Sequence, residues 1–332
     1  MKAACYSKYG PAHEVLEIRD LPTPLPAAGE VRVRVHASGI SPSDIYARSG
    51  VRKRPWSYDF VVPHQDGAGV IEAVSAGVAE RLVGARVWLY KAQWQRQFGT
   101  AAECICVPLD LTVVMPAKLS FEEAACLGIP AITAHRALAL AGELRGTTVL
   151  VAGGAGAVGF YLVQLAKAKG ATVIATAGSD TTRALAREAG ADHVLDYRAH
   201  DLADRVAQLT GGALAQVVFE VDLQANAPRL PGLLAKGGTL IVYGSGRGET
   251  VFPSTAGIQN SWTIRFVYLY DMSPEAIKAA LAELTGPLHS GSLRHLPVRR
   301  FALAAIAYAH AAVEAGNHGV RMIVMPQPGG QG

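Results

Sequence analysis

The segment that most constrains how this chain can fold is a glycine-rich turn between a strand pattern and a helix pattern. Residues 154–159 have the form G-x-G-x-x-G, after an apolar strand pattern at 148–152 and at the start of a helix pattern over 157–169. In this context the three glycines permit a tight turn, close approach of a pyrophosphate, and close packing of helix on strand. The helix N-terminus also offers unpaired N–H groups to an anion. The turn predicts a dinucleotide cradle made of Gly154, Ala155, Gly156, Ala157, Val158 and Gly159.

Strand and helix patterns alternate after this turn. A helix is expected at 181–189, and further strands at 172–176, 194–195, 216–220 and 239–243. Apolar strands that alternate with helices indicate a parallel sheet covered on both faces. The region is therefore predicted to be an α/β, doubly wound domain.

The regions on either side are richer in β-structure. Residues 30–36 (EVRVRVH) alternate valine with charged residues, which is the period-2 pattern of a half-buried strand. Beyond about residue 260 the pattern becomes mixed, with helices expected at 274–284 and 304–315 and a strand at 321–325. Because 332 residues exceed what one hydrophobic core usually serves, two domains are expected.

The composition excludes several classes of protein. The net charge of +4 is small and the basic residues are dispersed, apart from the run at 52–54, so nucleic-acid binding is not indicated. The four cysteines form no C-x-x-C pair and the chain is too large to need disulfides, which fits a reducing compartment. No signal-peptide pattern or apolar run of about 18 residues suggests export or a membrane span. We therefore expect a cytoplasmic protein.

The residues after the second strand of the α/β region indicate which dinucleotide binds. An NAD site places a carboxylate there for the ribose 2′-OH, but this position falls on Ala177 or Gly178. Asp180 comes slightly later and would restore an acidic partner if the alignment shifted. Ser179 offers a hydroxyl, and the guanidinium of Arg183 suits a 2′-phosphate. The pattern favours NADPH.

Several motifs, in order along the chain, resemble those of one family. They are HASGISPSDIYARSG, PHQDGAGVIEAVSAGV, GIPAITAHRAL, VAGGAGAVG and REAGADHVLDYR. Together they are similar to the medium-chain dehydrogenase/reductase superfamily, and specifically to its NADPH:quinone oxidoreductase group, which includes zeta-crystallin. The resemblance implies a GroES-like catalytic domain from residues 1–123 and 262–332, a Rossmann NADPH-binding domain at 124–261, and a homodimer formed through edges of the Rossmann sheets.

The resemblance also implies contacts to the cofactor. NADPH-binding members carry a basic residue after the second strand and a Tyr in an N/D-Y-R segment, and these places hold Arg183 and Tyr197. Thr133 corresponds to a residue beside the nicotinamide. Further residues expected to reach the cofactor are Tyr243, Gly244, Ser245, Asn317 and Arg321.

The resemblance bears on zinc as well. Zinc-dependent alcohol dehydrogenases of the superfamily have a Cys ligand where this chain has Ser41, a His ligand at Gln65, and a Cys or Asp ligand at Ile129. A hydroxyl, an amide and an isoleucine do not make the tetrahedral site that zinc prefers. The sequence therefore predicts no metal, with a rearranged site near His64 and Cys126 as the alternative.

Without a Lewis acid, the acceptor must already be electrophilic, such as a quinone or a carbon–carbon double bond conjugated to a carbonyl. Similar enzymes have the pattern Asn-x-x-Asp-x-Tyr, and residues 41–46 here read Ser-Pro-Ser-Asp-Ile-Tyr. Tyr46 is expected to donate its phenolic proton to the developing oxyanion, with Ser41 and Gln65 lining the cleft.

Three functions stay open at this point. The first is reduction of quinones by NADPH, and the second is reduction of an enone or enoyl double bond, which would use the same residues. The third is a crystallin-like protein that binds NADPH without turnover. The first two take a small-molecule substrate.

Overall fold

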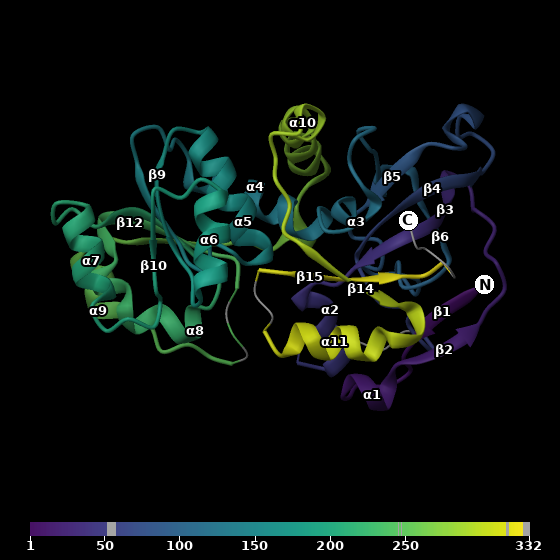
Figure 1. Cartoon of the computed structure of the whole chain (residues 1–332), viewed down its shortest axis with the longest axis horizontal. Helices are drawn as coiled ribbons and strands as arrows, with labels where there is room; N and C mark the ends of the chain where they lie inside the picture. Colours follow the sequence, from purple (N-terminus) through teal and green to yellow (C-terminus); the bar gives the residue numbers. More distant parts are fainter. Residues whose placement is uncertain (52–57, 245, 247, 317–318, 328–332) are drawn as a thin grey trace. The chain divides into compact units, whose positions relative to one another are not determined.

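The computed structural model describes residues 1–51, 58–244, 246, 248–316 and 319–327, and divides into two compact units (Figure 1). The first unit comprises Met1–Pro130 with Pro297–Gly332, and the second comprises Ala131–Leu296. The domain boundaries predicted from the sequence, at 123/124 and 261/262, stay predictions.

The first unit is built on a seven-stranded mixed sheet. Its strand order is β14-β15-β3-β4-β5-β7, with β6 paired to β3, and only β14 and β15 are parallel neighbours. The strands are β3 Glu30–Gly39, β4 Asp66–Val74, β5 Arg86–Leu89, β6 Cys104–Pro108, β7 Thr112–Val114, β14 Val298–Ala302 and β15 Arg321–Met325. A separate antiparallel pair consists of β1 Lys2–Cys5 and β2 Glu17–Asp20. The strand predicted at 30–36 is confirmed, and it continues to Gly39.

Four α-helices of the first unit are α1 Ala12–Val15, α2 Pro42–Ser49, α3 Phe121–Ala124 and α11 Ile306–Glu314. Helix α11 contacts both α2 and β15, and it buries Ile306 and Ala309 in a core shared with Met322 and Val324 of β15. This core fixes the start of α2, which carries Ser41 and Tyr46, relative to the sheet.

The second unit contains a six-stranded, all-parallel sheet with the order β10-β9-β8-β11-β12-β13. The strands are β8 Thr148–Val151, β9 Thr172–Thr176, β10 His193–Leu195, β11 Ala215–Glu220, β12 Leu234–Val242 and β13 Thr263–Phe266. The predicted parallel sheet is confirmed. The chain moves outward from β8 to β10 on one side and returns to β11 on the other, so the carboxyl ends of β8 and β11 form the switch point where such sheets bind ligands.

The helices of this unit are α5 Ala157–Ala168, α6 Asp180–Glu188, α7 Leu202–Leu209, α8 Leu223–Asn226, α9 Ser254–Gln259 and α10 Pro274–Ser290. Helix α4, Gly128–Ala141, begins in the first unit and continues into the second. Helix α10 runs six residues beyond the predicted end at 284, although it contains Pro287. The burial of Leu284 and Leu288 explains this extension, because packing outweighs the local cost of the proline.

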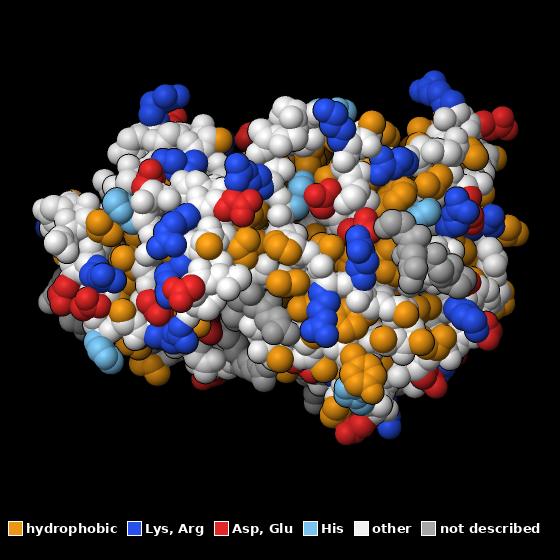
Figure 2. Space-filling view, viewed as in Figure 1, with side chains coloured by type: hydrophobic (Ala, Val, Ile, Leu, Met, Phe, Trp, Pro, Cys, Tyr) orange, Lys and Arg blue, Asp and Glu red, His pale blue; other side chains and the backbone are white. Residues whose placement is uncertain are grey.

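Two surface properties concern partners. No helix among the described residues combines the length and apolar character needed to cross a bilayer. On the face shown in Figure 2, the described Lys and Arg side chains are interspersed with Asp and Glu rather than gathered in a stripe.

Candidate functional site

The glycine turn of the second unit is bound to the neighbouring strand by one backbone and one side-chain hydrogen bond. The Gly153 N–H donates to Thr176 Oγ1 at 3.1 Å, and the Gly154 N–H donates to the Thr176 carbonyl at 2.9 Å. Gly153 has a φ of +66°, whereas Gly154 lies outside the left-handed region. Gly154 lies within the turn, and Gly153, just before the motif, supplies the left-handed backbone that favours glycine.

Lack of space for a side chain explains the glycines at positions 154 and 159 of the motif. A Cβ on Gly154 would lie 2.7 Å from Ala175 Cβ, and one on Gly159 would lie 2.1 Å from the Gly153 carbonyl oxygen. A Cβ on Gly156 would meet only the Gly153 oxygen, at 3.1 Å, so this residue is open on its other sides. The predicted roles of close packing at Gly159 and an open backbone at Gly156 fit this geometry.

Helix α5 begins immediately after Gly156, its N-cap, which has no side chain to cap the first turn. Ala155 is buried, whereas Ala157 and Val158 are partly exposed. Free N–H groups at the start of a twelve-residue helix attract an anion, and the partial positive charge of the helix adds to this. The turn and helix together fit the pyrophosphate of a dinucleotide.

The end of β9 has no carboxylate and is covered by a tyrosine ring. Ala177 is buried, and a Cβ on Gly178 would lie 2.6 Å from the Tyr197 hydroxyl oxygen and ring. Tyr197 therefore packs directly on Gly178 and is 40% exposed. The predicted Tyr197 lies at the place where the ribose of a dinucleotide is bound in this type of sheet.

Arg183 lies beside the same strand end and is held by two carboxylates. Its Nη2 is 2.6 Å from Asp180 Oδ1 and its Nη1 is 3.2 Å from Asp196 Oδ2. Asp196 also accepts from Arg198 Nε at 3.2 Å, and the Arg198 guanidinium lies over the Tyr197 ring at 5.5 Å. Sequence reasoning missed Arg198, although the Tyr-Arg dipeptide was visible. Two guanidinium groups are thus available where a 2′-phosphate would require them.

Ser179 has a structural explanation. Its Oγ accepts the Thr182 N–H at 3.2 Å, which makes Ser179 the N-cap of α6. Its Oγ also lies 2.9 Å from Thr182 Oγ1. The Ser179 hydroxyl, which was predicted to donate to the cofactor, is therefore engaged within the first turn of α6.

The switch point contains Tyr243, Gly244 and a buried acid. The Tyr243 hydroxyl donates to the Ala152 carbonyl at 3.1 Å, and burial raises the pKa of Tyr243. A Cβ on Gly244 would lie 1.8 Å from the Val221 carbonyl oxygen, so chain packing already requires glycine. Glu220, which sequence reasoning missed, is 2% exposed at the end of β11, and its Oε1 accepts from Asn226 at 2.9 Å. Burial raises the pKa of Glu220.

Three further residues predicted to contact the cofactor are Thr133, Ser245 and Asn317. Thr133 is buried in α4 of the second unit. Ser245 and Asn317 lie outside the described residues.

The substrate residues predicted in the first unit lie at and after the start of α2. Ser41 is the N-cap residue of α2, and its N–H donates to Asp44 Oδ2 at 2.7 Å. Ser41 and Asp44 are buried, and Tyr46 is half-buried in the middle of the helix. Through this hydrogen bond Asp44 braces the start of α2.

Asp66, at the start of β4, contacts Ser41 and Ile129, two of the positions at which zinc-dependent alcohol dehydrogenases carry a ligand. Its Oδ1 and Oδ2 accept the Ile129 N–H at 2.9 and 3.0 Å, and its Oδ2 accepts from Ser41 Oγ at 3.5 Å. The carboxyl is fully buried, and burial, followed by the charge of Asp44, raises its pKa well above the ordinary value. The hydrogen bond from Ile129, the charge of Arg321 and the hydroxyl of Ser41 oppose this rise.

Gln65 and Arg321 are buried polar side chains with unpaired atoms. Gln65 Nε2 donates to Gln93 Oε1 at 2.9 Å, whereas Gln65 Oε1 has no partner among the residues that the structure describes. Arg321, on β15, hydrogen-bonds the Cys126 side chain, but its Nε and Nη2 have no partner within the described part of the chain. Buried polar atoms are rarely left unpaired, so both side chains are suited to bind a ligand.

A buried histidine pair lies in the same unit. His64 Nε2 is 2.9 Å from His310 Nε2, and His64 Nδ1 is 2.7 Å from Ser38 Oγ. Burial lowers the pKa of His64 to about 3 and that of His310 well below its ordinary value. His310 is fully buried on α11.

Among the described residues, no group of three or more His, Cys, Asp or Glu side chains is arranged to hold a metal ion. Cys126, one of the two residues of the alternative site, is a buried free thiol, and burial raises its pKa.

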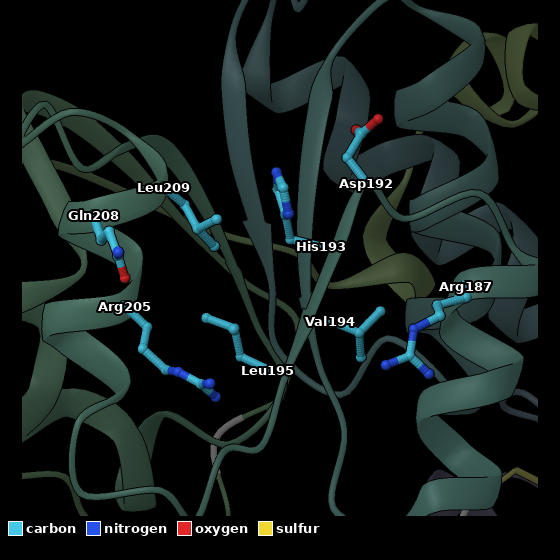
Figure 3. Close-up of a pocket in the computed structure, with 8 residues that line it drawn as sticks. All are labelled: Arg187, Asp192, His193, Val194, Leu195, Arg205, Gln208 and Leu209. Carbon is cyan, nitrogen blue, oxygen red and sulfur yellow. The ribbon is translucent and has the colours of Figure 1, made fainter.

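Figure 3 shows a pocket of about 340 Å³ beside the edge strand β10. It is lined by Arg187 of α6, His193 of β10, and Arg205 and Gln208 of α7, among others. Arg205 is paired with Asp201 at 3.5 Å. None of the predicted site residues that the structure describes lines this pocket.

Two family models match the chain. The alcohol dehydrogenase GroES-like domain matches residues 27–117, and the zinc-binding dehydrogenase model matches residues 157–286. These matches correspond to the mixed-sheet unit and the parallel-sheet unit and agree with the predicted combination of GroES-like and Rossmann folds.

Relatives and solved structures cover nearly the whole chain. Quinone oxidoreductase of Homo sapiens is 30% identical over 312 residues, 93% of each chain, and that of Pseudomonas aeruginosa is 32% identical over 335 residues, 97% of this chain and 98% of its own. A mycobacterial protein complexed with NADPH is 31% identical with a TM-score of 0.87, and Escherichia coli quinone oxidoreductase complexed with NADPH is 26% identical with the same score. Each comparison covers 98% of this chain and 100% of the other. The chain therefore belongs to the quinone oxidoreductase branch of the medium-chain dehydrogenase/reductase superfamily.

Proposed function

We propose that this protein is an NADPH-dependent reductase that transfers hydride to a quinone or a similar conjugated carbonyl acceptor without zinc. The observation that carries the proposal is the glycine cradle at Gly153–Gly159 together with Arg183 and Arg198 beyond the second strand. The relatives named quinone oxidoreductase, and the two related structures complexed with NADPH, support the same cofactor and acceptor class.

Different residues would hold the phosphate groups and the nicotinamide end of NADPH. The pyrophosphate would bind at the start of α5, and the 2′-phosphate would compete with Asp180 and Asp196 for the two guanidinium groups. Arg321 and Gln65, whose buried atoms lack partners, are the candidates in the first unit for polar contacts with nicotinamide or acceptor. NADPH supplies the hydride when bound.

The absence of a zinc requirement is supported by the side chains at the relevant positions. Asp66 holds Ser41 and the Ile129 backbone, and neither a serine hydroxyl nor an isoleucine is a usual zinc ligand. The zinc-binding dehydrogenase model spans 157–286, which contains none of the positions Ser41, Gln65 and Ile129. Tyr46 is proposed as the donor that stabilises the oxyanion formed on the acceptor.

Two measurements test this function. Fluorescence titration with NADPH and NADH should show tighter binding of NADPH, and NADPH oxidation with small quinones should persist in the presence of a metal chelator. Loss of activity with the chelator, restored by zinc, would refute the metal-free assignment. A panel of quinones and enones decides the acceptor: a strong preference for enones would make the protein an enone reductase. Tight NADPH binding without turnover of any acceptor would instead favour the crystallin-like function.

We also propose a homodimer and a reducing, cytoplasmic environment. Strand β13 is an edge strand whose four residues are all exposed, and Phe266 is 67% exposed, which leaves an apolar edge available for a second copy. All four cysteines are free and buried, which supports the reducing compartment.

A further inference from the structure

The side-chain amide of Gln65 has one free end. Gln65 lies directly before β4 and is 2% exposed. Its Nε2 donates to Gln93 Oε1 at 2.9 Å, whereas its Oε1 has no partner among the described residues. The oxygen and the nitrogen of an amide have nearly the same shape, so the hydrogen-bond partners decide which of them takes which place.

Gln93 fixes the orientation of the Gln65 amide. Gln93 Nε2 donates to the Arg96 carbonyl at 2.8 Å, and a carbonyl oxygen can only accept. Gln93 therefore turns its oxygen toward Gln65, and Gln65 meets that oxygen with its N–H2 group. The free end of the Gln65 amide is thus its oxygen, which is a hydrogen-bond acceptor.

The Arg96 carbonyl is held in place by further hydrogen bonds of the same residue. Arg96 Nη2 donates to Glu30 Oε1 at 3.0 Å and to the Cys106 carbonyl at 2.6 Å. The Arg96 N–H also donates to the Gln93 carbonyl at 3.1 Å. Gln93 cannot turn its amide over without facing the fixed Arg96 oxygen with its own oxygen, so its orientation is determined.

The backbone next to both glutamines adopts an uncommon conformation. His64, directly before Gln65, has a φ of +80°, and Gln95, two residues after Gln93, has a φ of +56°. Residues other than glycine rarely adopt these angles, and those that do are concentrated at binding and active sites. The Ala92 N–H donates to the Gln65 carbonyl at 2.9 Å, so the two segments are also joined through their backbones.

The free oxygen of Gln65 selects among ligands by their hydrogen-bond chemistry. The carbonyl oxygens of an unsubstituted quinone or enone only accept hydrogen bonds, so they cannot pair with it. A ligand with an O–H or N–H group can. A site that offers a buried polar group to such a donor discriminates strongly against analogues that lack it, because the buried group is then left unpaired.

We propose that Gln93 holds the Gln65 oxygen toward the acceptor, and that the preferred acceptor is a quinone or enone with a hydroxyl or N–H donor outside its reducible group. This inference rests on the proposed function, in which Gln65 lines the acceptor site. Both glutamines belong to the mixed-sheet unit, as Ser41 and Tyr46 do, whereas the phosphate cradle for NADPH belongs to the other unit. The acceptor is therefore the source of the donor, and Gln93 is a positioning residue.

Two matched acceptors test the preference. Hydroxymethyl-p-benzoquinone and ethyl-p-benzoquinone have nearly the same size, but only the first can donate to Gln65. Gln65→Met removes the free oxygen at nearly constant volume, so the ratio of the two kcat/KM values in this variant gives the intrinsic difference in reactivity. We expect the ratio in the wild type to favour the hydroxymethyl compound by about tenfold or more beyond that value.

Substitutions of Gln93 test its positioning role. Gln93→Lys offers only donor hydrogens, so Gln65 should turn its oxygen to the lysine and its N–H2 group to the ligand. The preference for the hydroxymethyl quinone should then fall to the Gln65→Met ratio or below it. Gln93→Glu keeps an oxygen that accepts from Gln65 Nε2 and should keep the wild-type ratio. Gln95→Lys, which adds the same charge to an exposed side chain of the same segment, is the matched control and should also keep it.

Binding without turnover gives a second readout. Benzyl alcohol and ethylbenzene are analogues of the two quinones that accept no hydride. Titration calorimetry of the protein saturated with NADPH should show that benzyl alcohol binds about tenfold more tightly to the wild type than to Gln65→Met, with no such difference for ethylbenzene. The affinity for NADPH itself should be the same in all variants.

The carboxamide of NADPH is another N–H donor, and the acetylpyridine analogue of NADPH, which lacks this N–H2 group, distinguishes it from the acceptor. A loss of affinity for the analogue that disappears in Gln65→Met, with no preference between the two quinones, overturns the proposed class of acceptor.

The other outcomes separate the inference from the proposed function. A wild-type ratio within about threefold of the Gln65→Met ratio overturns the preference, and a wild-type ratio that persists in Gln93→Lys overturns the role of Gln93. Reduction of the quinones by NADPH leaves the proposed function intact in both cases. A wild-type protein that reduces no acceptor refutes the proposed function, and this inference with it.

Discussion

Gly159 is the residue of the glycine turn with the least space for a side chain. We expect Gly159→Ala to weaken NADPH binding by about tenfold or more, because the added Cβ would lie 2.1 Å from the Gly153 oxygen and would move the turn. The same shift should lower the free energy of unfolding by about 1–3 kcal/mol, the usual cost of overpacking. Fluorescence titration and urea denaturation measure the two effects.

Gly286→Ala is the control for this substitution. Gly286 lies in α10 of the same unit, and nothing lies within 4 Å of an added Cβ. Its NADPH affinity should equal that of the wild type. Unchanged NADPH affinity in Gly159→Ala would mean that the turn does not form the cofactor site.

Arg183 is expected to determine the preference for NADPH over NADH. Arg183→Ala removes a charge-assisted contact to the 2′-phosphate and should weaken NADPH binding roughly tenfold to a hundredfold while NADH binding stays the same. Because Arg183 is held by Asp180 and Asp196, the loss should lie at the lower end of that range. Arg187→Ala, one turn later on α6, should change neither affinity. An equal loss for both coenzymes would exclude a 2′-phosphate contact.

At the scale of single residues, the sequence predicts which residue types form the site better than it predicts the role of each residue. The G-x-G-x-x-G pattern located the turn, but the left-handed residue is Gly153, just before the motif, since the turn begins where β8 ends. Ser179 was expected to face the cofactor, yet its hydroxyl caps α6. Sequence reasoning assigned no role to Asp66, because its contact with Ile129 joins residues 63 positions apart.

At the scale of elements, the buried parallel strands were predicted well because they are continuous apolar runs between helix patterns. Strand β13 was not predicted. All four of its residues are exposed, and an exposed edge strand lacks the burial pattern from which a strand is recognised. Ser120 and Glu123 form a capping box at the start of α3, an arrangement that depends only on neighbouring residues.

The buried His310 of helix α11 leads to a prediction of how the stability of the folded protein depends on pH. His310 and its partner His64 are held neutral in the folded protein, with the pKa of His64 at about 3, whereas both would bind protons below about 6.5 when unfolded. Burial is the main cause, and for His310 the charges of His64 and Arg48 add to it. The unfolded state therefore binds more protons below pH 6.5, and the folded state loses stability as the pH falls from 6.5 toward 3.

The expected slope is about 1.4 kcal/mol per pH unit for each histidine once the pH is well below 6.5. His310→Phe should remove about one histidine's share of the slope when urea denaturation is measured between pH 7 and pH 5. His13→Phe changes an exposed histidine of the same unit and should keep the wild-type slope. An identical slope in the wild type and in His310→Phe would show that His310 titrates normally in the folded protein.

At the scale of the whole molecule, the two units contribute different chemistry. The parallel-sheet unit contains the phosphate cradle and the guanidinium groups, and the mixed-sheet unit contains Ser41, Tyr46, Asp66 and Arg321. The second of these sets comes from both ends of the chain, since Arg321 follows Asp66 by 255 positions. Periodicity along the sequence cannot detect such a cluster, and only the family resemblance pointed to part of it.

Assembly is predicted from the free edge of β13. An exposed edge strand with apolar side chains is a template for pairing, and the proposed dimer would join two copies of β13 in one continuous sheet. We expect light scattering after size exclusion to give twice the mass of the 34.9 kDa chain. Phe266→Asp should shift the mass toward the monomer, because it places a charge in the pairing surface, where Phe266 is 67% exposed in a single chain.

Val114→Asp provides the matched control for assembly. Val114 is 60% exposed on β7, an edge strand of the other unit, so the substitution adds the same charge to a comparably exposed residue. Its mass should stay that of the dimer. A monomeric wild type would refute the dimer, and a dimer that survives Phe266→Asp but not Val114→Asp would place the interface on the mixed sheet instead. Because the glycine cradle and the guanidinium groups lie within one chain, monomeric Phe266→Asp should still bind NADPH with wild-type affinity.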